Sequence, residues 1–162
     1  MARDLIDQYA AGAEKLAQAI RGLTSEDLLA APPPGGPEVG RWTIQQVVIH
    51  LADAESAFAD RIKRIIAEDN ATLQAWDENR FVERLHYHDQ SAEDAVKIVE
   101  LTRKQVARIL KKLPDSAFAR KGVHSARGPQ TLIDVLNNAV PHLEHHLKFI
   151  HAKRAAMGKE MW

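Results

Sequence analysis

Apolar residues recur every three or four positions along four stretches of the chain, a pattern typical of helices that bury one face. The stretches predict helices over residues 4–21, 43–69, 91–113 and 131–155. No stretch alternates apolar and polar residues convincingly, as a half-buried strand would. The pattern therefore predicts an all-α fold, and a chain of 162 residues fits one domain, residues 1–162.

Residues that start and stop helices mark the limits of these stretches. Gly22 can end the first helix, and Thr43 with Gln46 three positions later forms a capping box for the second. The proline-rich run 32–37 excludes regular structure and predicts a long crossover loop. Residues 71–90 form a second long connection without a clear period. Such connections predict a bundle other than a minimal up-and-down array.

Composition and charge exclude some classes of function and some kinds of metal ligand. Lys plus Arg and Asp plus Glu both number 22, which gives no net charge at pH 7, whereas domains that grip nucleic acid are usually basic. The chain has no cysteine, so a metal would be held by histidine and carboxylate. The first residues lack a signal-peptide core, and no run is long enough to span a membrane. We expect a cytoplasmic protein without nucleic-acid or membrane partners.

His142 and His146 are the residues that most suggest metal binding. A spacing of four advances a helix by about 400°, so both side chains leave nearly the same face one turn apart. The apolar stripe of that helix places both near its edge and places His145 toward solvent. His50 lies on the flank of the stripe of the second helix. If the two helices pack together, three imidazoles can hold one ion with a coordination position open, as in catalytic sites.

Ordinary packing also accounts for histidines in such positions. The spacing of four is necessary for a metal site but not specific, because a histidine at the edge of a stripe is usually a half-buried core side chain. Trp42 is explained by packing at a helix start. Trp76 is explained either by surface packing or, beside Asp77 and Glu78, as a residue that helps to wall a pocket. We expect Arg61 on a solvated face, and Arg103 either at the surface or in an anion-binding cavity. Three more histidines are expected in loops: His86, His88 and His124.

Two segments resemble the signature motifs of the DinB/YfiT-like superfamily. Residues 41–55 contain a Trp-Thr-Ile helix start followed by His50, and residues 131–147 contain His142 and His146. The order of helices and loops also agrees over nearly the whole chain. The resemblance implies a four-helix bundle with up-down-down-up connectivity. It also implies a divalent ion, commonly nickel or zinc, on these three histidines.

The resemblance also implies a class of function. Related proteins include metal-dependent thiol transferases, so the chain is expected to perform thiol-S-transfer or hydrolysis on a small-molecule substrate, with a low-molecular-weight thiol as co-substrate in the first case. Asp77, Glu78 and Glu55 are candidates for a base or a further ligand, and no spacing selects one of them. The alternative is a bundle without turnover, a metal-binding or scaffold protein linked to stress response.

The oligomeric state is a further expectation. Several apolar residues lie off the main helical stripes, and an exposed apolar strip is often an interface. Examples are Ile49, Ile66 and Val140. Members of the resembled family commonly form dimers, and together with these residues this predicts a homodimer.

Overall fold

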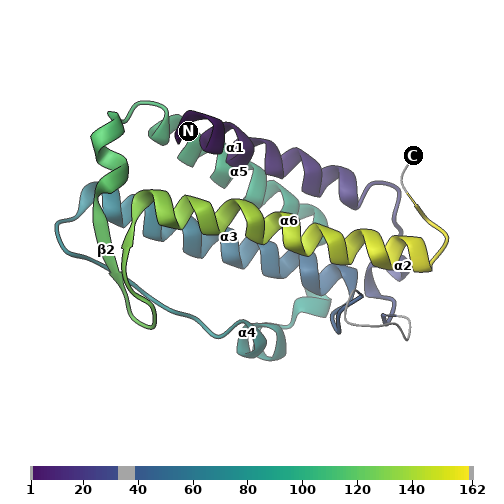
Figure 1. The fold of residues 1–162 in the computed structure, drawn as a ribbon. Helices are drawn as coiled ribbons and strands as arrows, with labels where there is room; N and C mark the ends of the chain where they lie inside the picture. Colours follow the sequence, from purple (N-terminus) through teal and green to yellow (C-terminus); the bar gives the residue numbers. More distant parts are fainter. Residues whose placement is uncertain (1, 33–38, 161–162) are drawn as a thin grey trace.

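Four long helices form a bundle in the computed structural model, which describes residues 2–32 and 39–160 (Figure 1). They are α1 (Ala2–Ala19), α3 (Ile44–Ala67), α5 (Ala92–Leu110) and α6 (Leu132–Ala156). α1 and α6 run in one direction along the bundle, and α3 and α5 run in the other. The four-helix bundle and its up-down-down-up connectivity confirm the fold expected from the sequence.

Each predicted limit of a long helix lies within three residues of the observed one. Two capping boxes explain why the histidine-bearing helices start where they do. Thr43 and Gln46 satisfy each other's backbone N–H groups at the start of α3, and Thr131 and Asp134 do the same for α6. Burial of the apolar residues of each helix, such as Leu51 and Leu143, then sets the face from which its histidines project. The predicted proline-rich crossover loop falls almost entirely outside the described residues.

The connections contain structure that the periodicity did not indicate. A short helix, α2 (Ser25–Leu29), follows α1. Strand β1 (Ala71–Leu73), helix α4 (Glu78–Arg84) and the 3-10 turn η1 (Tyr87–Asp89) lie between α3 and α5. A second 3-10 turn, η2 (Asp115–Ala119), precedes strands β2 (Lys121–His124) and β3 (Gly128–Thr131). β2 is the central strand, parallel to β1 and antiparallel to β3. The apolar pattern did not reveal this small sheet, because strands of three or four residues are too short to show alternation.

The bundle core lies between the four long helices. α1 packs against α5 and α6, and α3 packs against the same two helices. Ile49 and Val140 are 1% and 9% exposed, so they belong to this core and do not form an exposed apolar strip. The homodimer remains a prediction, without support from these two residues. Within the described ranges, no helix combines the length and apolar character needed to cross a membrane.

Candidate metal centre

His50 of α3 and His142 and His146 of α6 converge inside the bundle. The Nε2 atom of His50 lies 3.3 Å from Nε2 of His142 and 3.1 Å from Nε2 of His146. One ring nitrogen from each of the three lies within 4.8 Å of the others. His50 and His146 are buried and His142 is partly buried, whereas His145 is exposed, as the helix phase predicted. The structure thus brings together the three histidines that the sequence singled out.

The spacing of these nitrogens fits a divalent ion. Two nitrogens bound to one ion at about 2.1 Å with tetrahedral angles lie about 3.4 Å apart, close to the observed separations. Hydrogen bonds alone do not account for this cluster. Nε2 of His50 lies near two other Nε2 atoms, but each nitrogen of a neutral imidazole is either a single N–H donor or a single acceptor. When Nε2 binds an ion, Nδ1 carries the ring proton. The Nδ1 atoms of His50 and His146 are buried without a partner among the described residues, so packing must orient these two rings.

Aromatic side chains provide that packing. The Trp42 ring centroid lies 4.9 Å from that of His50 and 6.1 Å from that of His146, and the latter pair is stacked. Trp76 stacks on His50 from the connection between β1 and α4, at 5.6 Å. Trp76 is partly buried, and together with Asp77 it lines a cavity beside the cluster, as one of the two interpretations of Trp76 predicted. Trp42 does more than pack at the start of α3, because it also contacts the histidine cluster.

Burial keeps the three imidazoles neutral at pH 7. It lowers the pKa of His50 to about 3, with a contribution from His142. It lowers the pKa of His142 to about 4 and that of His146 to about 2, with contributions from neighbouring cationic groups. The neutral ring is the form that binds a metal. The site therefore presents three unprotonated donors without needing to lose protons first.

Two candidate carboxylates lie at the start of α4, beside the histidines. The Oε2 atom of Glu78 is 3.9 Å from Nε2 of His50, and the Glu78 side chain is about half exposed. Asp77 caps α4 by accepting hydrogen bonds from the backbone N–H groups of Asn79 and Arg80. Glu78 is therefore the carboxylate best placed to exchange protons at the site, while Asp77 mainly positions it.

Glu55, the remaining candidate, lies in a different buried network. Its carboxylate accepts hydrogen bonds from the Tyr9 hydroxyl and from Nε of Arg103, the latter at 2.6 Å. Both Glu55 and Arg103 are 2% exposed. Arg103 also donates to the backbone carbonyl of Tyr9. Arg103 is thus neither at the surface nor an anion-binding group, and Glu55 is occupied by this ion pair.

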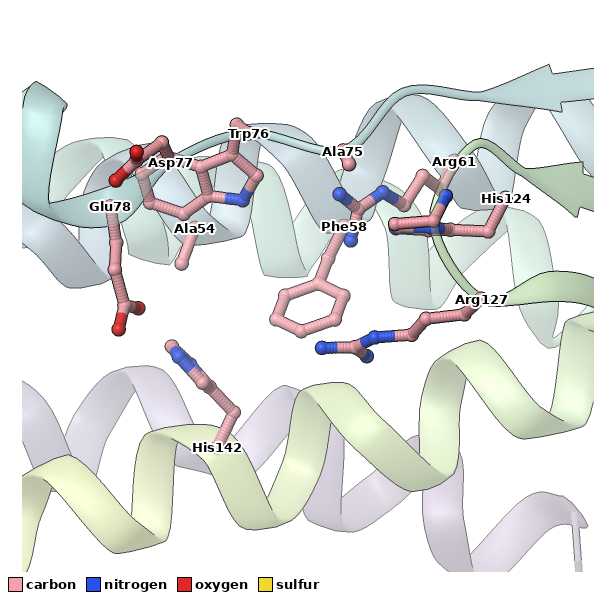
Figure 2. Close-up of a pocket in the computed structure, with 11 residues that line it drawn as sticks. Ala54, Phe58, Arg61, Ala75, Trp76, Asp77, Glu78, His124, Arg127 and His142 are labelled. Atoms are coloured by element: carbon pink, nitrogen blue, oxygen red, sulfur yellow. The ribbon is translucent and has the colours of Figure 1, made fainter.

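Two cavities flank the histidine cluster, and His142 and Glu78 line both of them. Their volumes are about 490 and 590 Å³, within the usual range for small-molecule sites. Figure 2 shows the first, with His142 and Glu78 at one end and a cationic cluster at the other. That cluster consists of the Arg61 and Arg127 guanidiniums and of the His124 imidazole, whose pKa is lowered by burial and by the two arginines, so that it is neutral. The lining of the second cavity also includes Phe149 and Lys153.

The cationic cluster is the part of the site that sequence reasoning missed. Arg61 was expected on a solvated face but is 7% exposed, and it donates a hydrogen bond of 2.7 Å to the carbonyl of Gln74. His124 was expected in a loop but ends strand β2 and is 4% exposed. Both placements depend on the pairing of β1 with β2, which the periodicity does not reveal.

A family model for the DinB superfamily matches residues 8–150. The chain belongs to the DinB superfamily. It is similar to YfiT of Bacillus subtilis, with 27% identity over 145 residues. The match covers 89% of this chain and 79% of YfiT. The solved structure of YfiT superposes with a TM-score of 0.86 at 25% identity, covering 97% of this chain and 87% of that one.

The names of the relatives point to metal-dependent chemistry. YfiT is described as a probable metal-dependent hydrolase with an unusual four-helix bundle topology. A protein of Oceanobacillus iheyensis, also named as a probable metal-dependent hydrolase, is 28% identical over 111 residues. That match covers 68% of this chain and 64% of the relative, so it leaves about a third of the relative unmatched. The names and the three-histidine cluster together support a metal-binding site in this chain.

Proposed function

We propose that the chain is a metal-dependent enzyme that transfers a low-molecular-weight thiol to an electrophilic small molecule. The observation that carries the proposal is the meeting of three neutral imidazoles beside two cavities, both of which are lined by His142. A site with three protein ligands leaves room for an exogenous group, as catalytic metal sites do. Two cavities that share His142 and Glu78 can hold two reactants, a thiol and its acceptor, against the same centre.

A divalent ion held here supplies Lewis-acid chemistry, which lowers the pKa of a water or thiol bound to it. Nickel and zinc are the ions we propose, since both accept imidazole ligands. With no cysteine in the chain, the reacting sulfur must come from a separate thiol. The three histidines carry no charge of their own, so they leave the full positive charge of the ion available for this activation.

The surrounding side chains have separate tasks in this proposal. Glu78, half exposed and 3.9 Å from the histidine cluster, accepts the thiol proton and passes it to solvent. Trp42 and Trp76 hold the His50 ring between them and keep water from it. Phe58, whose ring centroid is 5.6 Å from that of His142, forms an apolar wall beside the reacting atoms.

Hydrolysis is the second candidate, favoured by the names of the relatives and by the position of Glu78. The same carboxylate that takes a proton from a thiol can take one from water. The histidine cluster serves both reactions. The difference lies in which nucleophile reaches it.

Cobalt substitution tests the proposal, because sulfur bound to cobalt gives a charge-transfer band. We expect 2-mercaptoethanol to produce this band in the cobalt-loaded protein and not in the His146→Ala variant. Consumption of thiol with chlorodinitrobenzene would then show transfer, whereas release of nitrophenol from nitrophenyl acetate without thiol would show hydrolysis. If neither thiol nor a small anion changes the cobalt spectrum, the site is closed to substrate. The bundle without turnover would then replace the enzyme.

A further inference from the structure

We infer that the first cavity binds the substrate through an oxyanion, a carboxylate or a phosphate, held by Arg61, Arg127 and His124. Arg61 and His124 lie at the end of the cavity away from His142, and the Arg127 guanidinium reaches from that end past Phe58 toward His142 (Figure 2). The inference deepens the proposed function and rests on it for one point, that the reacting part of the substrate lies at the histidine cluster. The oxyanion site itself depends only on the two arginines and His124.

Arg61 is a buried guanidinium with unused hydrogen-bond donors. Its side chain is more than nine-tenths buried, and its Nε atom has no partner in the described part of the chain. Of its five N–H donors, one on Nη2 reaches the carbonyl of Gln74. Its neighbour Asp60 accepts bonds of 3.0 and 2.8 Å from Arg64. Among residues 2–32 and 39–160, no carboxylate lies within 4 Å of the Arg61 guanidinium to neutralise it.

Arg127 and His124 add donors from the β2–β3 hairpin. The Arg127 guanidinium extends into the cavity between Phe58 and α6 (Figure 2). No carboxylate of the described chain pairs with it. His124 accepts a hydrogen bond at Nδ1 from the backbone N–H of Ala126, at 3.2 Å. In its neutral form His124 therefore carries its proton on Nε2 and is a donor.

The charges in this cavity are separated along its length. Arg61 lies at one end and Arg127 reaches inward from it (Figure 2), and burial together with the charge of Arg127 lowers the pKa of Arg61. The carboxylates that line the cavity, Asp77 and Glu78, lie at the other end, by Trp76 and His142. Asp77 is further engaged with Arg80 at 3.3 Å. A buried cation without a partner is costly, and a bound oxyanion would remove this cost through charge-assisted hydrogen bonds.

The shape and lining of the cavity also indicate which class of substrate fits it. Phe58 lies between Arg61 and His142 (Figure 2), so the part of the substrate that joins an oxyanion at Arg61 to its reacting group passes an apolar wall. A cavity of about 490 Å³ accommodates a molecule of metabolite size. The substrate class is therefore a small organic acid or phosphate ester with a short apolar linker.

The first experiment uses the metal-free protein, so that no anion can bind an ion. The Nε–Hε resonances of arginine are followed by NMR during titration with propionate, inorganic phosphate and the neutral propionamide. We expect either anion, and not propionamide, to shift the Arg61 and Arg127 resonances. A larger response to propionate identifies a carboxylate site, and a larger response to phosphate identifies a phosphate site. No response to either anion would overturn the inference.

Variants decide whether the named residues cause the binding. Arg127→Gln changes an exposed residue and should fold, and we expect it to weaken anion binding about tenfold. Arg61→Lys keeps the charge but loses the planar fork, and should weaken binding to a similar degree. Arg108→Gln removes the same charge from an exposed position of α5 outside the cavity and serves as the matched control. Equal affinity in Arg127→Gln and Arg108→Gln would refute the assignment.

A second experiment separates this inference from the proposed function. The cobalt-loaded protein is titrated with 3-mercaptopropionate and with 3-mercapto-1-propanol, which differ in the carboxylate. We expect the acid to bind about tenfold more tightly, and this preference to disappear in Arg127→Gln. If no thiol alters the cobalt spectrum while anions still shift Arg127, the proposed function fails and the oxyanion site stands. If both thiols bind equally and the NMR titration is flat, the oxyanion site fails and the function stands.

Discussion

His145 and His146 are neighbours in the sequence with opposite environments. His146 is 8% exposed with its Nε2 atom beside that of His50, while His145 is exposed. We expect His146→Ala to lower metal affinity at least about tenfold, because a three-ligand site cannot replace a lost donor. His145→Ala should leave metal content unchanged. Metal analysis of protein purified without a histidine tag measures both variants, and equal loss in the two would show that the ligands are misassigned.

Glu55 provides a second test at a single residue, because the structure gives it a structural role. Replacing it with Gln leaves the Arg103 guanidinium buried without a counter-charge, which typically costs about 3–5 kcal/mol. We expect Glu55→Gln to reduce the free energy of unfolding by an amount of this order while the metal-to-protein ratio stays the same. Denaturant unfolding and metal analysis check the two parts. Lost metal with unchanged stability would instead place Glu55 at the metal centre.

Single residues differ in how far the sequence predicts their roles. The pairing of His142 with His146, and the outward direction of His145, follow from the helical repeat alone. His50 required the family resemblance, because periodicity within one helix does not tell which other helix it faces. Arg61 lies on a well-predicted helix, yet its burial depends on the strand and loop that cover it. That covering segment is non-local, so no pattern near Arg61 signals it.

At the scale of elements, the packing of α1 against α5 depends on a glycine. A Cβ atom built on Gly12 would lie 2.2 Å from Nη1 of Arg103, and Arg103 cannot easily move because it is bound to Glu55 and to the carbonyl of Tyr9. In an open helix Gly→Ala stabilises by about 1 kcal/mol, but overpacking typically costs about 1–3 kcal/mol. We therefore expect Gly12→Ala to destabilise the protein.

Thermal unfolding measures this effect, and Glu14→Ala on the exposed face of the same helix is the control. The control should change the unfolding free energy by less than about 0.5 kcal/mol. A Gly12→Ala protein more stable than the parent would show that Arg103 can shift aside, and that the α1–α5 contact is looser than the structure indicates.

Elements also show why some structure is visible in the sequence and some is not. The long helices carry several turns of apolar repeat and clear caps, so their limits were predicted closely. β1 pairs with β2 through three residues, with Ala71 opposite Gly122, about fifty positions apart in the chain. Gly122 has no room for a side chain, since a Cβ there would lie 2.9 Å from Leu73. Such pairing is fixed by tertiary contact rather than by local preference.

The topology of the whole molecule brings the three histidines of the candidate metal centre together. The chain leaves α3 at one end of the bundle and returns along its length through β1, α4 and η1 before α5 begins (Figure 1). α5 therefore runs parallel to α3, and α6 can pack directly against α3. This contact brings His50 to His142 and His146. The same return path carries Trp76 and Glu78 past the cluster, so the long connection forms part of the site.

The last prediction concerns the stability of the whole molecule against pH. The pKa values of His50, His142 and His146 are about 3, 4 and 2 in the folded chain, and about 6.5 for an unperturbed histidine. Between these limits the unfolded chain binds more protons than the folded one, so the free energy of unfolding rises with pH. The stabilisation is complete above pH 6.5 and is lost as pH falls toward the folded pKa values.

We therefore expect the metal-free protein to lose at least about 2 kcal/mol of stability between pH 6.5 and pH 5, since one such histidine contributes about 1.4 kcal/mol per pH unit. A bound ion stabilises the folded state by mass action and must be released before the rings protonate. The metal-loaded protein should therefore hold its stability to lower pH and then lose it more steeply. Denaturant unfolding at each pH measures both curves.

His146→Gln should flatten the metal-free curve, whereas His151→Gln, at an exposed position of the same helix, should not. A metal-free protein equally stable at pH 5 and pH 7 would mean that these imidazoles are accessible to protons, and that the buried neutral cluster is not the resting state of the site.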